Sequence, residues 1–452
     1  MKTHKTLTGG TLKQAIDWLF RDEMFADYKQ HGNATWSLSA VVTVALLWAW
    51  GGEDGLQERF RNGLTILPRL FRRPQWGTTY QGFIKILRTW TGLLLPTVVD
   101  RLRKRMQQVS GAHWTVHGWT VMAVDGTRVE TPRTKANEAW FGRLPKQSRR
   151  RRKSSRRRKG KQKCKKHPSA PQVWLTVMWH VGAGLLWDWR QGPSRSSERT
   201  HLLEMLDQLP DSTLLVADAG FQGYEYWQAL LDRGHSFLIR VGGNVRLLKG
   251  LGSVRRRHGI VFLWPEKARK RKQPPIVLRL FELHDGRRSV WLVSNVLDPQ
   301  KLSQQHALEI YRLRWGVEVF IRGFKQTFGR GKLRSHAPQN VEMELDWSLV
   351  ALWSMELLAI RELLATDRVP HDVSTVGALR AIRQALQWAA MGSDFDLFSR
   401  LAASRHDGYQ RKRKSIRRWP KRKVEPPVSS PKIRVATAEQ IIDAYEIQSQ
   451  AA

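Results

Sequence analysis

The sequence predicts a mixed α/β fold, in which a sheet flanked by helices follows an N-terminal helical domain and is interrupted by a β-rich insertion. Three observations lead to this prediction. Apolar residues recur at three- and four-residue spacing up to about residue 110, as on one face of a helix. Short apolar runs of strand length then alternate with helical patterns up to residue 241. Helical periodicity is absent from the pattern of residues 242–295.

The first 110 residues are expected to form a helical domain. Ala15, Trp18 and Leu19 fall on one helical face, and the same spacing returns near Leu87. Prolines at positions 68, 74 and 96 divide the segment, so we expect four to six helices.

Residues 111–241 are expected to form the first part of a sheet-containing core. Trp119–Val124 is apolar and is predicted to be a buried strand closed by a turn at Asp125-Gly126-Thr127. The elements that should follow are a hairpin of residues 173–181 and 185–190, a helix at 196–209, a strand at 214–217, a helix at 224–232 and a strand at 236–241.

The rest of the chain divides into three predicted parts. The β-rich insertion spans residues 242–295, with strands expected at 260–264, 276–283 and 289–296. Residues 296–365 show strong helical patterns and complete the core. Residues 366–452 are expected to form a helical C-terminal region and a basic tail.

Charge indicates a polyanionic partner. The chain has 77 Lys and Arg against 39 Asp and Glu, which gives a net charge of +38. Repulsion among these charges destabilises the folded state, and an enzyme that acts on small molecules has no need of so large a charge. Residues 143–166 hold 15 basic residues and no acid, and residues 411–423 hold nine more, so 24 of the positive charges lie in two blocks. Nucleic acid is the first candidate partner. The residues expected to contact it in these blocks are Arg150, Arg151, Arg157, Arg158, Arg411, Arg413 and Arg417.

Composition excludes several other classes of protein. With 41% hydrophobic residues and 21 Trp, the chain can bury a large core, so it is not a disordered protein. One cysteine, Cys164, excludes a disulfide framework and a Cys-rich zinc site. The most apolar run, residues 40–50, is about half as long as the roughly 20 residues that span a bilayer. We therefore expect a cytoplasmic protein with no membrane partner.

Two acidic residues follow directly on predicted strands. Asp125 comes after VMAV and Asp218 comes after LLVA, and each is followed by small residues. Sites in α/β sheets are assembled at the carboxyl ends of strands. Two carboxylates that meet there repel each other, so a divalent metal ion is the expected ligand. The alternative is that each Asp only caps a turn.

The helix after the insertion carries one polar and one apolar face. At about 100° per residue, the side chains of Tyr311, Arg314, Glu318 and Lys325 lie within about 60° of one another. The opposite face carries Leu313, Val317, Phe320 and Phe324. One side therefore packs on a core, and the other offers a hydroxyl, two cations and a carboxylate. A solvated helix face is the alternative, but this set suits metal and phosphate better.

The spacing Tyr-x₂-Arg-x₃-Glu-x₆-Lys at residues 311–325 resembles the bacterial DDE transposases of insertion sequence family four. The similarity extends to Asp125-Gly-Thr, to Asp218-x-Gly-Phe and to the β-rich insertion, over roughly residues 116–364. It implies a ribonuclease H-like core with Asp125, Asp218 and Glu318 as its catalytic triad. The basic block at 143–166 is a departure from the family pattern, and the outer helical regions resemble it only loosely.

The resemblance also implies the chemistry. The triad would hold two Mg²⁺ ions, with Mn²⁺ as a substitute, about 3.5–4 Å apart for in-line phosphoryl transfer. Tyr311, Arg314 and Lys325 would bind phosphates near the scissile bond, and the 1–110 domain would bind DNA. Trp291 matches a family tryptophan that stacks on a flipped base, with a core aromatic as the alternative.

The partners would be double-stranded transposon-end and target DNA in the bacterial nucleoid. Because two ends must be joined, we expect a homodimer on DNA.

Several other residues are assigned no chemistry. Asp188 is expected on the exposed side of its hairpin, Glu198 near a helix start is a favourable partner of the helix dipole, and Trp315 is assigned to packing. Two other functions remain as alternatives, namely a DNA-binding protein on an inactivated scaffold and a basic RNA-binding structural protein. An intact triad disfavours the first, and the arginine runs alone support the second.

Overall fold

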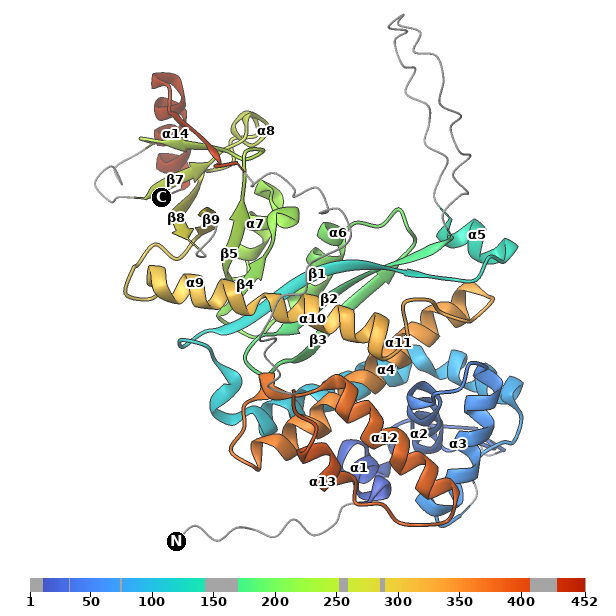
Figure 1. The fold of residues 1–452 in the computed structure, drawn as a ribbon. Helices are drawn as coiled ribbons and strands as arrows, with labels where there is room; N and C mark the ends of the chain where they lie inside the picture. The colour runs from blue at the N-terminus through green and yellow to red at the C-terminus, as the bar shows by residue number, and fades with distance from the viewer. Residues whose placement is uncertain are drawn as a thin grey trace, which may run out of the picture.

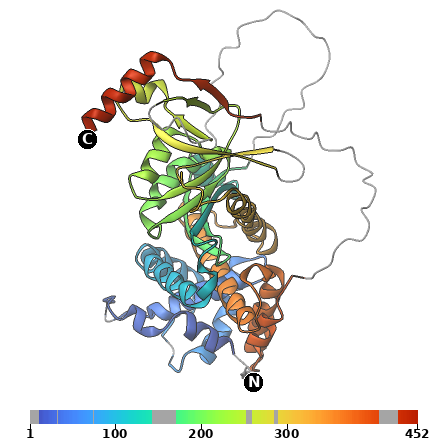
Figure 2. The same ribbon diagram turned by 90° about the vertical axis from the view of Figure 1, so that its left-hand side faces the viewer.

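The computed structural model describes residues 11–31, 33–73, 75–142, 170–251, 259–284, 289–406 and 429–451. Helices gather at one end of the molecule, below a long sheet in Figure 1, and the C-terminal helix lies at the other end. Figure 2 shows the same division after a 90° turn. The predicted mixed α/β class is confirmed.

The helical layer is built by helices from both ends of the chain. The N-terminal helices are α1 (Leu12–Leu19), α2 (Leu38–Trp50), α3 (Leu56–Leu70) and α4 (Tyr80–Ser110). The C-terminal ones are α11 (Pro338–Leu364), α12 (Thr375–Ala390) and α13 (Leu397–Ala402). Almost every residue of α2 is buried because α3, α4 and α11 surround it, which accounts for its continuous apolar sequence.

Helix α4 is long and apolar enough, by length and composition alone, to cross a membrane, together with the short 3₁₀ turn that follows it. One such helix is weak support for a membrane span. Its buried residues recur every four or seven positions, as at Phe83, Leu87, Leu94 and Val98, and it packs on α11. This pattern is that of an amphipathic helix on the surface of a helical layer.

The central sheet contains β1 (Thr120–Glu130), β2 (Gln172–His180), β3 (Leu185–Gly192), β4 (Thr213–Ala217) and β5 (Ser236–Val241). These strands lie in the order β3-β2-β1-β4-β5. Strands β1, β2 and β3 are antiparallel neighbours, whereas β4 and β5 run parallel to β1. This order and direction are those of a ribonuclease H-like sheet, as the sequence predicted.

Strand β1 is longer than the sequence predicted. The expected turn at Asp125-Gly126-Thr127 is wrong, because antiparallel pairing with β2 continues as far as Glu130. Parallel pairing with β4 ends earlier, at Ala123 opposite Val216. Asp125 therefore lies within a strand, at the point where the neighbouring strand ends.

Further strands extend the sheet on the side of β5. They are β6 (Arg246–Lys249), β7 (Ile260–Leu263), β8 (Ile276–His284), β9 (Ser289–Ser294) and β10 (Lys432–Val435). Strand β9 pairs with β5, and the order continues β8-β7-β6-β10, so the sheet has ten strands in all among the described residues. Helices α8 (Glu266–Lys270) and α14 (Ala438–Ala451) lie at this end.

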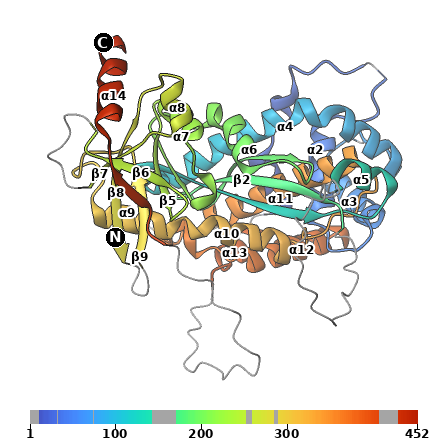
Figure 3. The same cartoon turned by 90° about the horizontal axis from the view of Figure 1, so that it is seen from above.

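Helices cover both faces of the central strands. Helix α6 (Glu198–Met205) packs on β1, β2 and β3, and its neighbour α7 (Tyr224–Leu231) packs on β5. Helices α9 (Gln304–Leu313) and α10 (Trp315–Arg322) cross the other face, with α10 on β1 and β2. Figure 3 shows α6 and α10 on opposite sides of the sheet. The short α5 (Lys135–Phe141) follows β1.

Candidate active site

Asp125 and Asp218 lie at the same edge of the sheet. Asp125 is two residues past the last pair that joins β1 to β4, and Asp218 directly follows β4. Each carboxylate is oriented by a backbone N–H group of its own segment. Oδ1 of Asp125 accepts a hydrogen bond from the Gly126 N–H at 2.8 Å, and Oδ1 of Asp218 accepts one from the Gly220 N–H at 2.7 Å.

The two aspartates act on each other electrostatically. The pKa of Asp125 is raised from its ordinary value of 3.8 to about 6, chiefly because burial disfavours its charged form. The negative charges of Asp218 and Glu318 raise it further. Asp125 is thus a half-buried carboxylate crowded by two others, and a cation at this position would relieve the repulsion.

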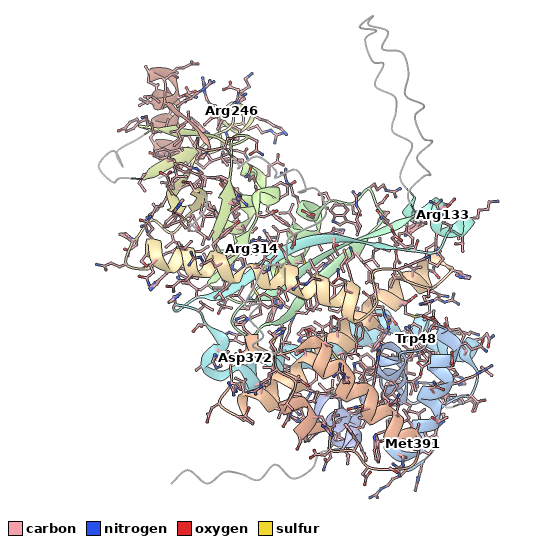
Figure 4. All side chains as sticks on the ribbon, viewed as in Figure 1. Trp48, Arg133, Arg246, Arg314, Asp372 and Met391 are labelled. Carbon is pink, nitrogen blue, oxygen red and sulfur yellow. The ribbon has the colours of Figure 1, made fainter. Side chains whose placement is uncertain are left out.

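Glu318 reaches this edge from α10 and is held by an arginine. Nη2 of Arg314 donates to Oε1 of Glu318 at 2.6 Å, across one helical turn. Arg314 is only 9% exposed, and it lies near the middle of the molecule in Figure 4. The structure therefore brings Asp125, Asp218 and Glu318 together, with Arg314 engaged by the glutamate.

Two buried donor atoms at this site lack a well-formed hydrogen bond. Among the described residues, neither the hydroxyl of Tyr311 nor Nε of Arg314 has a well-formed hydrogen bond. The guanidinium of Arg314 lies 5.5 Å from the centre of the Tyr311 ring. Burial raises the pKa of the Tyr311 hydroxyl, so it stays protonated as a donor. Buried donors are rarely left unpaired, so these two fit an oxygen-rich ligand such as a phosphate.

Lys325 adds a cation on the far side of Asp125 along β1. Its Nζ donates to Oγ1 of Thr127 at 3.2 Å and to the carbonyl of Arg128 at 2.9 Å. Lys325 lies in a π-helical turn, Gly323–Thr327, that directly continues α10. Such turns frequently occur at functional sites. Opposite, Val317, Phe320 and Phe324 are buried, as the predicted apolar face requires.

A model of the transposase DDE domain matches residues 117–354, which include all of these side chains and more than half of the chain. The chain belongs to the DDE transposase family.

A curated relative agrees with this assignment. The transposase InsG of insertion sequence element IS4, from Escherichia coli strain K12, is 25% identical over 254 residues. The match covers 54% of this chain and 52% of InsG, so the chain spans about half the length of that relative. The predicted membership of insertion sequence family four is confirmed.

A solved structure has a weaker likeness. It is the cryo-EM structure of a piggyBac transposase synaptic complex with hairpin DNA, which aligns with a TM-score of 0.43 and 10% identity. The alignment covers 84% of this chain and 80% of the other. A TM-score at this level supports no inference about the transposase described here.

A fourth carboxylate of the transposase, Glu198, was assigned no chemistry from the sequence. It is the first residue of α6, where it does favour the helix dipole. Its pKa is raised from 4.5 to about 6, chiefly by burial and then by the charges of Asp125 and Asp218. Glu198 therefore lies beside the aspartates. Its position depends on how α6 packs, and a sequence search for strand-end carboxylates does not reveal it.

Trp291 lies on β9 at the same edge of the sheet. It is half-buried, and its register partner on β5 is Val241, the last residue of that strand. Two strand spacings separate it from β4 in the sheet order, roughly 10 Å. This placement is compatible with a base-stacking residue, which remains a prediction.

Two residues lie differently from what the sequence predicted. Asp188 was expected to be exposed, but it is 6% exposed and forms ion pairs with Arg190 and with Arg103 of α4. The packing of α4 on β3 buries it. Trp315 was assigned to packing, but it is 57% exposed.

The basic blocks lie outside the described residues. This applies to Arg150, Arg151, Arg157 and Arg158, and to Arg411, Arg413 and Arg417. Their role in binding DNA stays a prediction from the sequence.

The carboxylates of the site fit a hard divalent cation. Within the described parts of the chain, no three His, Cys, Asp or Glu side chains are close enough to hold a metal ion as they stand. Oε1 of Glu318 accepts from Arg314, so a metal ion bound through this oxygen would compete with the arginine. The donors, however, are all carboxylate oxygens, which suit Mg²⁺. Their mutual repulsion, seen in the raised pKa of Asp125, also favours a cation between them.

Proposed function

We propose that this protein is a transposase that binds the terminal repeats of an insertion sequence, cleaves the DNA strands there and transfers them to a target. The observation that carries the proposal is the meeting of Asp125, Asp218 and Glu318 at one edge of a ribonuclease H-like sheet, inside the matched DDE domain. The activity would be metal-dependent phosphoryl transfer in a cut-and-paste reaction.

Asp125, Asp218 and Glu318 would hold two Mg²⁺ ions, or Mn²⁺ in their place. When bound, these ions lower the pKa of the attacking water and stabilise the leaving oxygen in an in-line displacement. Asp125 and Asp218 are oriented for this task by the Gly126 and Gly220 N–H groups. Glu318 would join them once Arg314 turns to the phosphate.

Basic and hydroxyl groups would bind the DNA backbone around the scissile bond. The unpaired Nε of Arg314 and the hydroxyl of Tyr311 would donate to phosphate oxygens. Lys325, fixed against β1, would contact a neighbouring phosphate. Trp291 would stack on an unpaired base, which contributes about 1–3 kcal/mol.

The remaining parts of the chain would supply affinity and assembly. The basic blocks, including Arg150 and Arg413, would bind phosphates without sequence selection. The 1–110 helical domain would contact the terminal repeats. Two copies of the chain would pair two DNA ends, in the bacterial cytoplasm and at the nucleoid.

The test is cleavage of a labelled duplex that carries the terminal repeats of the element. We expect cleavage by the wild-type protein in Mg²⁺ and none in EDTA, with Mn²⁺ able to substitute. The Asp218→Asn protein should bind the duplex but not cut it. Cleavage by this variant at the wild-type rate would exclude the proposed catalytic role of Asp218.

A further inference from the structure

Glu198 contacts the segments of both aspartates. A β-carbon at Gly126 would lie 2.5 Å from Oε1 and 2.7 Å from Cδ of Glu198, closer than atoms can approach. A β-carbon at Gly220 would lie 3.4 Å from Oε2 of the same carboxylate. Gly126 directly follows Asp125, and Gly220 donates its N–H to Asp218. The carboxylate of Glu198 therefore occupies the space that a side chain at Gly126 would fill.

The N-terminal cap of α6 and a hydrogen bond from α6 to the segment after Asp218 hold Glu198 beside the aspartates. Ser197 caps the helix by accepting a hydrogen bond from the Thr200 N–H, which fixes the first turn. The next residue, Arg199, donates from Nε to the carbonyl of Gly220 at 2.7 Å. This bond joins the start of α6 to the segment after Asp218. The helix start and the aspartate segment are thus fixed relative to each other.

No described residue forms an ion pair with Glu198 in the structure, whereas Glu318 is paired with Arg314. The site contains a buried cation, Arg314, as well as the carboxylates. Arg314 is nine-tenths buried there and leaves its Nε without a partner among the described residues. Arg199 and Arg128 lower the pKa of Glu198 electrostatically, but burial and the charges of Asp125 and Asp218 outweigh them, so the pKa of its carboxyl is raised to about 6.

We infer that Glu198 is a fourth carboxylate of the catalytic centre, which holds a divalent cation together with Asp125 and Asp218. This inference rests on the proposed function, since it assigns a further ligand to the same metal-dependent site. Glu198 is the first residue of α6, which lies on the face of the sheet opposite to α10, so it would add negative charge from the side that does not carry Glu318. Gly126 has a specific role in this arrangement, because any side chain there would displace the glutamate.

The test is Mn²⁺ binding to the full-length protein without DNA, measured by electron paramagnetic resonance and calorimetry. Glu198→Gln keeps the shape of the side chain and removes its charge. We expect it to weaken Mn²⁺ binding at least about tenfold, as changes around metal sites commonly do. Glu204→Gln, on the same helix with a side chain 52% exposed, is the matched control and should bind Mn²⁺ like the wild type.

Gly126→Ala provides a second variant that changes no charge. Its methyl group should displace Glu198, so we expect it to weaken Mn²⁺ binding to a similar extent. Combined with Glu198→Gln it should add little further loss, because both changes remove the same ligand. Thermal melting in EDTA shows whether each variant is folded.

The outcomes separate this inference from the proposed function. If Asp125→Asn loses Mn²⁺ binding and DNA cleavage while Glu198→Gln and Gly126→Ala bind Mn²⁺ like the wild type, the role of Glu198 is wrong and the transposase assignment stands. If Asp125→Asn itself binds Mn²⁺ and cleaves DNA normally, the proposed catalytic centre is wrong.

Discussion

Helices α6 and α10 lie on opposite faces of the sheet, and each presents one glutamate to the same two aspartates. On α10, Glu318 is paired with Arg314 one turn away. On α6, Glu198 lies over Gly126, and the pKa of its carboxyl is raised to about 6. One glutamate is thus held in an ion pair within its own helix, whereas the other lies against the segments of the aspartates and has a raised pKa.

This difference indicates how several neighbouring carboxylates can be tolerated in the folded protein. Three or four carboxylates close together repel one another, and a buried charge without a partner is costly. Arg314 offsets part of that cost without metal or DNA. It can then serve phosphate when Glu318 turns to a metal ion. On the α6 side, Arg199 and Arg128 offset part of the repulsion, the pKa of Glu198 is still raised to about 6, and a bound cation would relieve the rest.

The largest expected effect comes from Glu318. Glu318→Gln removes the α10 carboxylate charge and should lower DNA cleavage about a thousandfold or more, as the loss of a catalytic group commonly does. The measurement is single-turnover cleavage of terminal-repeat DNA in Mg²⁺. Glu309→Gln, on the adjoining α9 and with a side chain 39% exposed, is the control and should cleave normally. Equal rates for the two variants would contradict the role of Glu318.

A smaller effect is expected at Arg314. Arg314→Lys keeps a positive charge but loses the planar group that can contact both Glu318 and a phosphate. We expect cleavage to fall about a hundredfold, in the range seen when one donor to a transition state is removed. Mn²⁺ binding without DNA should not weaken. A loss of Mn²⁺ affinity as large as that of Glu198→Gln would show that the two faces do not differ as described.

Lys325 should have a smaller role again. Lys325→Met preserves the length of the side chain but removes its bonds to Thr127 and Arg128 and its phosphate contact. We expect a loss of about tenfold in cleavage at low DNA concentration, equivalent to about 1.4 kcal/mol. The salt dependence of DNA binding should become shallower, because one fewer phosphate is neutralised. An unchanged salt slope would remove Lys325 from the DNA surface.

A separate effect concerns the stability of the metal-free protein. The pKa of Asp125 is raised from 3.8 to about 6, so the folded state binds more protons than the unfolded state between these values. The free energy of unfolding should therefore fall as the pH rises from about 4 to about 6. Asp125→Asn should remove up to about 3 kcal/mol of this fall, since one pKa unit corresponds to about 1.4 kcal/mol.

Thermal melting in EDTA at pH 5 and pH 7 measures this effect. The wild-type protein should lose more stability between the two pH values than Asp125→Asn does. An identical loss in both proteins would show that Asp125 is not the group that titrates.

The sequence predicts what is local and misses what depends on packing. The polar residues at positions 311, 314, 318 and 325 could be placed on one face because a helix fixes their relative angles. The sequence predicts that the strand ends at Asp125, whereas β1 continues to Glu130 because it pairs with β2, which lies beyond the long basic block. The closeness of Glu198 depends on α6 packing across β1. Asp188 is buried by an arginine from α4, far away in the chain.

The most direct test of the catalytic centre is the location of bound Mn²⁺ by anomalous X-ray scattering from crystals of the protein. We predict anomalous density in contact with the carboxylates of Asp125 and Asp218, with Glu198 beside it and Glu318 released from Arg314. Anomalous density elsewhere, with Asp125 and Asp218 in contact with no metal ion, would contradict this account of the site.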